Sequence, residues 1–371
     1  MNLLSEMSGI TGAQKMNRGW ARFFLTVFLL GFVMVWTTTA RAASASPSHR
    51  RCAFDIGSGE TKLSAAEVVI AGPKPTMTKL LAKRILLPFA KSLEGRMIPD
   101  WLIEEAIAKL NELRNQCDAL GAREYSGVAT SGFRMAQNAK HALARIIQGT
   151  KIPLRVITGE QEAVLAFLAA ASALRFEVKN LVVWDIGGGS LQFSMSADHV
   201  IEAQPDYIIS AGHEGAELFR REIAKQLNRG AEQTVNPLDQ AEMNRAVALA
   251  KQWSQAVNPK IKEKLRRRDT RVVGLGGIHA ESLVAQAGLR FKSPYKIYTI
   301  DGVRRAARRA VNMSDQDFRN AYPKNQYPES QATNLALVLG YMENLHIEQV
   351  IPLQVTLADG LLVHQAYWDP K

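Results

Sequence analysis

Apolar and polar positions follow an α/β pattern from about residue 51 to the C-terminus. Residues 53–57 read as a buried strand that runs into a glycine turn, and residues 62–70 read as the returning strand, so the two predict a β-hairpin. Residues 99–117 carry apolar side chains on one face at helical spacing. Strands are also predicted over 125–129 and 154–157, and helices over 134–147 and 160–175. Strands that alternate with helices in this way are typical of an α/β fold.

The strand and glycine turn that open this pattern occur a second time. Asp55 ends the first strand just before Gly57, and Asp185 ends a later strand, residues 180–186, just before Gly187. Residues 192–195 again read as the returning strand. A repeat this far apart predicts two related domains that face each other, because solenoid repeats are much shorter.

A third glycine turn follows a strand near residue 273. Gly274, Gly276 and Gly277 lie in this turn, and a helix over 280–286 is predicted after it.

The first 42 residues have the pattern of an export signal. Arg18 and Arg22 precede an apolar run over 23–36, and small residues up to Ala42 form a cleavage site. The run is shorter than the roughly 20 residues that span a bilayer. We therefore expect cleavage after Ala42 and a periplasmic or secreted protein, with an uncleaved membrane anchor as the alternative.

These observations predict four segments. They are a signal peptide over 1–42, a polar linker over 43–50, a first domain over 51–176 and a second domain over 177–371.

Composition excludes several classes of protein. The 371 residues include 47% hydrophobic residues, which excludes a disordered or collagen-like chain. Lys and Arg number 46 against 35 Asp and Glu, a formal charge of +11. Such a charge favours polyanionic ligands but also serves solubility alone. No nucleic-acid-binding motif accompanies it, so we expect no nucleic-acid partner.

The basic residues form two groups. One lies over 262–268, and the other consists of Arg304, Arg305, Arg308 and Arg309 on one helix face. That face either guides a polyanion or is merely solvated.

The only cysteines are Cys52 and Cys117, which excludes a cysteine zinc site and a disulfide scaffold. A bridge between them is one option in an oxidising compartment. We expect instead two unpaired, small core residues.

The repeated glycine turns carry the candidate chemistry. A glycine turn between two strands directs backbone N–H groups outward, and such a nest binds phosphate. Asp55 and Asp185 would lie beside that phosphate and could hold Mg²⁺ directly or through water, since a hard cation takes oxygen ligands. Two facing turns would hold a phosphate chain from both sides. The alternative is a set of tight turns without a ligand.

Two further side chains are candidates. Glu162 falls in the first turn of a helix that Thr158 caps, where an acidic residue is also favoured by the helix dipole alone. It could act as a general base. Arg134 begins a helix and could bind phosphate through its planar guanidinium, or could be a surface cation.

Four segments together resemble the exopolyphosphatase/guanosine pentaphosphate phosphatase (Ppx/GppA) family. They are residues 54–58, 128–134, 157–163 and 183–190, in the family's order and spacing. Residues 273–277 and 357–362 resemble its later motifs. The resemblance implies two actin-like (ribonuclease H-like) domains, each a mixed sheet flanked by helices, around an interdomain cleft. It also implies hydrolysis of phosphoanhydride bonds in polyphosphate or pppGpp with Mg²⁺.

The resemblance also assigns roles to residues. Glu162 matches the catalytic glutamate that activates water, and Asp185 the carboxylate on the metal side. Together with the turns, it predicts phosphate binding by Gly57, Ser58, Lys62, Arg134, Gly187, Gly188, Gly189, Ser190, Gly276 and Gly277. Members of the family often dimerise, so a homodimer is one expected partner state.

Some positions differ from the family pattern. Gln192 replaces an acid that supports metal or water, and Glu60 places an anion beside the first turn. An amide accepts hydrogen bonds but carries no charge. A second hypothesis is therefore a polyanion-binding protein whose site has lost catalysis. A third is a sugar or acetate kinase on the same fold, against which the phosphatase motifs argue.

Overall fold

The computed structural model describes residues 48–371 except 72–74, 91, 94–95, 175–177, 198–205, 231–233, 293 and 369–371. The predicted signal peptide therefore lies outside the described residues. Of the predicted linker, Ser48–Arg50 already belong to the first strand.

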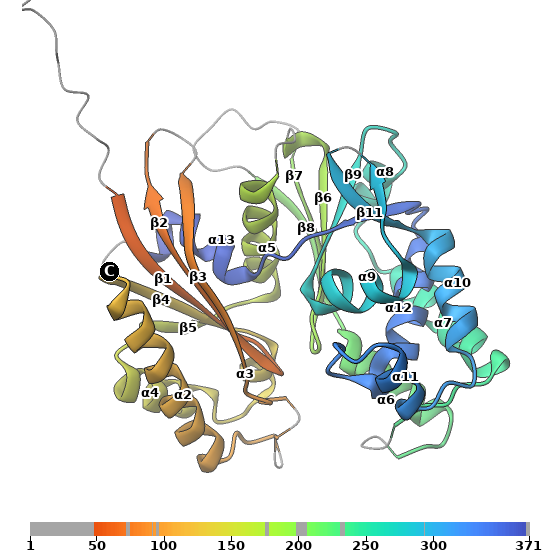
Figure 1. The fold of residues 1–371 in the computed structure, drawn as a ribbon, viewed down its shortest axis with the longest axis horizontal. Helices are drawn as coiled ribbons and strands as arrows, with labels where there is room; N and C mark the ends of the chain where they lie inside the picture. The colour runs from red at the N-terminus through yellow and green to blue at the C-terminus, as the bar shows by residue number, and fades with distance from the viewer. Residues whose placement is uncertain are drawn as a thin grey trace, which may run out of the picture. The chain divides into compact units, whose positions relative to one another are not determined.

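The first sheet has five strands (Figure 1). In sheet order they are β3 (Thr76–Leu86), β2 (Glu60–Val69), β1 (Ser48–Ile56), β4 (Glu124–Ala129) and β5 (Leu154–Val156). The predicted hairpin is present as β1 and β2, which pair antiparallel with Asp55 opposite Lys62. β4 pairs parallel to β1, and β5 pairs parallel to β4, so the sheet is mixed.

The second sheet repeats this arrangement with more strands. In sheet order they are β10 (Arg290–Lys292), β11 (Tyr295–Thr299), β12 (Gln349–Pro352), β9 (Arg271–Leu275), β6 (Leu181–Ile186), β7 (Leu191–Ser196) and β8 (Tyr207–His213). The predicted second hairpin is β6 and β7, which place Asp185 opposite Gln192. β9 lies parallel to β6 on its other side, so the third glycine turn emerges beside the second.

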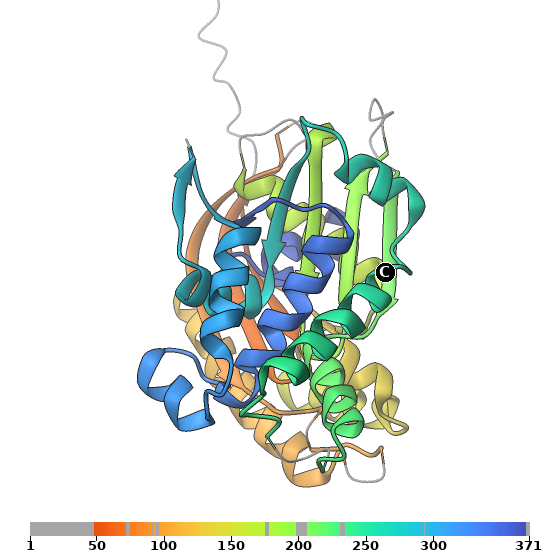
Figure 2. The same ribbon diagram turned by 90° about the vertical axis from the view of Figure 1, so that its right-hand side faces the viewer.

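Helices cover both sheets. They are α2 (Asp100–Ala119), α3 (Ser131–Met135), α4 (Ala139–Thr150), α5 (Gly159–Ala173), α6 (Ala216–Gln226), α7 (Gln240–Ser254), α8 (Pro259–Leu265), α9 (Leu283–Ala287), α10 (Ile300–Ala310), α11 (Asp315–Ala321), α12 (Gln331–Asn344) and α13 (Leu357–Val363). Figure 2 shows α10, α12 and α7 side by side in front of the second sheet, in agreement with their mutual packing. Among the described residues, no helix is both long and apolar enough to cross a bilayer.

The C-terminal helix α13 returns to the first half of the chain. It packs against β1, β2 and α5, and α5 in turn packs against β6, β7 and β8 (Figure 1). Gly360 permits this approach, because a Cβ there would lie 2.0 Å from the carbonyl oxygen of Leu165 in α5. The predicted second domain, 177–371, thus includes a segment that packs on the first sheet.

The predicted helix over 134–147 is wrong in one respect. The chain forms two helices, α3 and α4, that are separated by an extended residue, Ala136. The helix over 99–117 is confirmed as α2, whose buried face includes Leu102, Ala106 and Leu110.

The expectation of two unpaired cysteines is wrong. Cys52 and Cys117 form a disulfide that joins β1 to α2. α2 packs so that the two Cα atoms are 6.4 Å apart, within the range that a disulfide spans. Both residues are fully buried, so the bridge lies within the core.

We expect this disulfide to contribute stability. Replacement of both cysteines by alanine should lower the free energy of unfolding by about 2–4 kcal/mol, because the bridge closes a long loop in the unfolded chain. Denaturant unfolding with and without a reductant would measure this. Equal midpoints for the two proteins under oxidising conditions would contradict it.

Candidate active site

The first two glycine turns have the same local structure. The N–H of Gly57 donates to the carbonyl of Glu60, and the N–H of Gly187 donates to the carbonyl of Ser190. These two N–H groups close their turns, so the phosphate binding predicted at Gly57 and Gly187 does not rest on their amides. Any nest is formed by the residues that follow each of them.

The two turns lie against each other. A Cβ at Gly188 would lie 3.1 Å from Oγ of Ser58, and a Cβ at Gly189 would lie 2.5 Å from Oγ of Ser131. Glycine at both positions therefore allows backbone from the second half to approach hydroxyls of the first. Ser131, which had no predicted role, begins α3 one residue after the buried Thr130.

The third turn adjoins the second. Gly276 has a φ of +87°, and a Cβ there would lie 2.3 Å from the carbonyl oxygen of Ile186 and 3.3 Å from Oδ1 of Asp185. This contact requires glycine both for its backbone angle and for its lack of a side chain. Gly277 is helical, and a Cβ there would have no atom within 4 Å.

Glu162 lies where these turns meet, and local sequence explains how it is held. Thr158 caps α5, and with Gln161 it forms a reciprocal capping box, as the prediction of an N-cap required. Glu162 is buried in the first turn of α5. It accepts hydrogen bonds from Oγ of Ser190 at 3.1 Å and from Nη2 of Arg134 at 2.8 Å. Glu162, Ser190 and Arg134, which lie in three different motifs of the sequence, are thus brought into contact.

Arg134 is partly buried, so it is not a solvated surface cation. Its other terminal nitrogen donates to the carbonyl of Ile157 at 2.9 Å, just before α5. The guanidinium therefore ties α3 to the start of α5. Burial raises the pKa of Glu162, and the charge of Arg134 and the two hydrogen bonds oppose that rise.

A second ion pair lies beside the first. Nζ of Lys62 is 3.7 Å from Oδ2 of Asp55, its cross-strand neighbour. Burial raises the pKa of Asp55 against the opposing effect of Lys62. Burial alone would lower the pKa of Lys62, but the negative charges of Asp55, Glu60 and Asp185 raise it. Lys62 therefore stays protonated.

Asp185 is a third buried carboxyl of the site. Burial, the charge of Glu162 and the charge of Asp55 raise its pKa to about 7, against the opposing effect of Lys62. Three buried carboxyls thus face two cations, Lys62 and Arg134. A bound cation or a retained proton would balance the remaining negative charge.

Gln192 lies opposite Asp185 in the β6–β7 hairpin and is 1% exposed. Neither Oε1 nor Nε2 has a hydrogen-bond partner in the described part of the chain. A buried amide without partners is costly, so a water or substrate atom is expected to bind there.

One contact across the turns was not foreseen. Arg84 of β3 lies 3.4 Å from Glu60 and 2.6 Å from Glu281, which follows the third glycine turn. Arg84 therefore neutralises the anion that Glu60 places beside the first turn. The strand β3 had not been predicted, because most of its side chains are exposed and it has no apolar face that repeats.

These residues belong to a shared sequence pattern. The family model described as Ppx/GppA phosphatase family matches residues 89–367, most of the chain. The chain belongs to the Ppx/GppA phosphatase family. The β1–β2 hairpin with Asp55 and Lys62 precedes the matched range, whereas Arg134, Glu162 and Asp185 fall inside it.

Members of this family and their relatives align over part of the chain. This chain is 27% identical over 159 residues to exopolyphosphatase 1 of Mycobacterium tuberculosis. The aligned region makes up 43% of this chain and 46% of that protein. An uncharacterised protein of Streptomyces coelicolor is 31% identical over 143 residues, 38% of this chain and 42% of that protein. The matches therefore span less than half the length of these curated relatives.

Solved structures agree with the family's fold. A Ppx/GppA family member from Aquifex aeolicus superposes with a TM-score of 0.67 at 21% identity, covering 86% of this chain and 98% of that one. An exopolyphosphatase from Cytophaga hutchinsonii has a TM-score of 0.65 at 16% identity, covering 85% and 96%. The predicted α/β fold, two mixed sheets flanked by helices in an actin-like arrangement, is confirmed.

Among the described residues, no group of three or more His, Cys, Asp or Glu is placed to hold a metal ion. Mg²⁺ needs fewer protein ligands, because it commonly binds one or two carboxylates and takes its other oxygens from water and phosphate. Oδ1 of Asp55 is buried without a partner among these residues, and Asp185 is undercompensated. The two carboxyls therefore fit this ion.

Proposed function

We propose that the protein hydrolyses the terminal phosphoanhydride bond of inorganic polyphosphate or of a nucleotide polyphosphate such as pppGpp. One observation carries this proposal. Glu162 is buried between Ser190 and Arg134, beside facing glycine turns that suit a phosphate chain.

The reaction would be an in-line attack by water on the terminal phosphorus. The oxygen of the water forms the new P–O bond, Glu162 accepts its proton, and the bond to the bridging oxygen breaks. Orthophosphate and a chain one phosphate shorter are the products. Lys62, Arg134 and the turn amides would stabilise the charge on the transferring group.

We propose Mg²⁺ as the cofactor, with Asp55 and Asp185 as the residues that would hold it. When bound, the ion would neutralise phosphate oxygens and the excess negative charge of the site. Lys62 would still hold Oδ2 of Asp55, which leaves Oδ1 for the ion or its water.

We also propose that the protein is exported. Its first 42 residues have the pattern of a signal peptide. The Cys52–Cys117 disulfide supports this, because structural disulfides persist in oxidising compartments such as the periplasm.

Gln192 favours one alternative, a polyphosphate-binding protein without turnover. Its neutral amide occupies a buried position opposite Asp185, where an acid would add charge for metal or water. This alternative predicts tight binding of polyphosphate and no release of phosphate at any Mg²⁺ concentration.

Phosphate release by residues 43–371 decides between the two. Polyphosphate, pppGpp and ATP would each be assayed with Mg²⁺ and with a chelator. We expect release from polyphosphate or pppGpp that needs Mg²⁺. Binding without release would support the alternative, a polyphosphate-binding protein without turnover. Release unchanged by the chelator would remove the metal from the proposal.

A further inference from the structure

The first glycine turn is joined to the second half of the chain by four side chains, two from each half. Glu60 begins β2, and its carboxylate lies 3.4 Å from Nε of Arg84 in β3. The same carboxylate accepts a hydrogen bond from the hydroxyl of Tyr327, which lies between α11 and α12. Nη1 of Arg84 lies 2.6 Å from Oε1 of Glu281, which follows the third glycine turn. Polar side chains therefore connect the first turn to the third.

The direction of Arg84 depends on the pairing of β2 with β3. The register of the two strands shifts next to Leu80, which is an extra residue in β3. Past this shift, Arg84 lies opposite Lys62, and Lys62 lies opposite Asp55 on β1. Directly opposed residues point to the same face of a sheet, so these three side chains share the face that bears the site. Regular pairing from the start of β3 would place Arg84 on the other face, because side chains alternate along a strand.

Gln331 fixes the two partners that the second half provides. It begins α12 and is 3% exposed. Its Oε1 accepts a hydrogen bond from Oγ of Ser282 at 2.6 Å, and its Nε2 donates to the carbonyl of Tyr327 at 2.8 Å. Ser282 directly follows Glu281 in the chain. A buried polar group with satisfied hydrogen bonds holds its neighbours in one arrangement, so Glu281 and Tyr327 are presented together.

The backbone of the first turn is held by the chain that follows β3. The carbonyl of Ser58 accepts from the N–H of Ala90 at 2.8 Å, and the carbonyl of Gly59 accepts from the N–H of Leu87 at 3.2 Å. β3 and the first turn are therefore fastened to each other. A contact made by Arg84 acts on the whole turn, not on one side chain.

We propose that Glu60, Arg84, Glu281 and Tyr327 form a clamp that holds the first glycine turn against the third. These four are positioning residues, because they act on the site through the turns. Glu60 differs from the family pattern, and the clamp gives this difference a role other than loss of catalysis.

The clamp sets the spacing between charges that belong to different halves of the chain. Asp55 and Lys62 lie on the first hairpin, next to the first turn. Asp185 lies beside the third turn, since a Cβ at Gly276 would be 3.3 Å from its Oδ1. Holding one turn against the other fixes these groups relative to one another. The effect of the clamp on turnover rests on the proposed function of this site, whereas its effect on the turns does not.

Hydrogen exchange measured by mass spectrometry would test the clamp directly. Arg84→Ala should speed amide exchange over residues 57–60 and 276–282 roughly fivefold, because a small network of partly exposed ion pairs is lost. Arg84→Lys keeps the charge without the planar fork and should restore part of the protection. Tyr327→Phe removes only the hydroxyl and should act in the same direction as Arg84→Ala. Unchanged exchange over both segments in Arg84→Ala and Tyr327→Phe would overturn the proposal.

Salt provides a readout that a purely steric role of Arg84 would not produce. In the parent protein, raising the ionic strength should speed exchange over the same two segments, because screening weakens exposed ion pairs. Arg84→Ala should lack this dependence. An equal response to salt in the parent and in the variant would contradict an electrostatic clamp.

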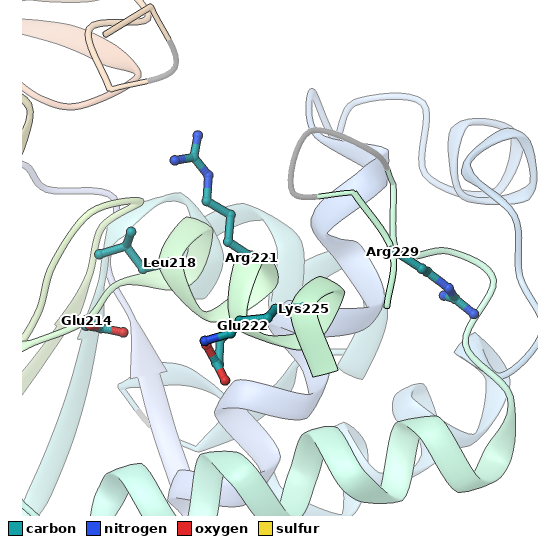
Figure 3. A pocket seen from close by; sticks show the side chains of 6 residues that line it. All are labelled: Glu214, Leu218, Arg221, Glu222, Lys225 and Arg229. Atoms are coloured by element: carbon teal, nitrogen blue, oxygen red, sulfur yellow. The ribbon is translucent and has the colours of Figure 1, made fainter. Parts of the chain in front are cut away.

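Two control variants lose a charge within the second half alone. Arg304 lies 3.0 Å from both Asp301 and Glu343, and its exposure of 39% is close to the 34% of the clamp arginine. Lys225 lines a cavity of about 550 Å³ beside α6 and lies near Glu222 (Figure 3). Arg304→Ala and Lys225→Ala should leave exchange over 57–60 and 276–282 as in the parent. A rise in either control equal to that in the clamp variant would refute the proposal, because loss of any charge would then loosen the turns.

Steady-state kinetics would separate failure of the clamp from failure of the proposed hydrolase. With polyphosphate as substrate, Arg84→Ala should lower kcat roughly fivefold and change KM less, since the clamp positions the turns and does not bind the chain. If the parent releases no phosphate but the exchange results are as expected, the clamp stands and the hydrolase does not. If the parent is active and kcat of Arg84→Ala equals that of Arg304→Ala, the clamp has no positioning role.

Discussion

Glu162→Gln should lower kcat for phosphate release by roughly 10³-fold, because a positioned general base contributes about 10²–10⁴. The amide has the size of the carboxylate, its oxygen can still accept from Arg134, and its NH2 group can donate to Oγ of Ser190. The fold and the binding of substrate should therefore change little. Stopped assays of orthophosphate, with calorimetric binding of polyphosphate beside them, would measure both effects.

Glu160→Gln is the matched control for this experiment. Glu160 lies in the same first turn of α5 but is exposed, so its replacement removes the same charge outside the site. Its turnover should stay near that of the parent. Turnover in Glu162→Gln within a few-fold of that control would remove Glu162 from the role of base.

Gly276→Ala should produce the second large effect. At a φ of +87° the new Cβ would lie 2.3 Å from the carbonyl of Ile186, so the backbone of the third turn must move away from the second. We expect a loss of about 2–4 kcal/mol in the free energy of unfolding. Turnover should fall as well, because the same turn adjoins Asp185.

Gly277→Ala serves as its control in denaturant unfolding. Gly277 has helical angles, and a Cβ there would have no neighbour within 4 Å. Its replacement should leave stability unchanged or raise it by about 0.4–1 kcal/mol. Similar unfolding midpoints for the two variants would show that the Gly276 contact with Ile186 is not a constraint.

Local patterns predicted much of this molecule. The two hairpins, α2 and the cap at Thr158 each depend on residues that are close in sequence, and the structure contains all of them. The exposed strand β3 was missed because Lys79, Lys83 and other polar residues give it no apolar face. The interruption between α3 and α4 was missed because the apolar spacing continues through it.

Contacts between distant segments were beyond such patterns. The bridge between Cys52 and Cys117 depends on how α2 packs on β1, and 65 residues separate the two cysteines. Arg134 had been considered as a phosphate ligand or a surface cation, whereas the structure pairs it with Glu162. Arg84 acquires its role only through Glu281, almost two hundred residues later in the chain.

The sequence by itself determined which residue types could handle phosphate, because glycine turns after Asp-ended strands are short and local. Repetition of that turn also determined that two similar halves exist. Only the tertiary structure decided that Glu162, Ser190 and Arg134 share one buried cluster, and that burial and neighbouring carboxyls raise the pKa of Asp185. The physical reason is that burial and charge at a site are sums over side chains from many segments, and packing alone brings those segments together.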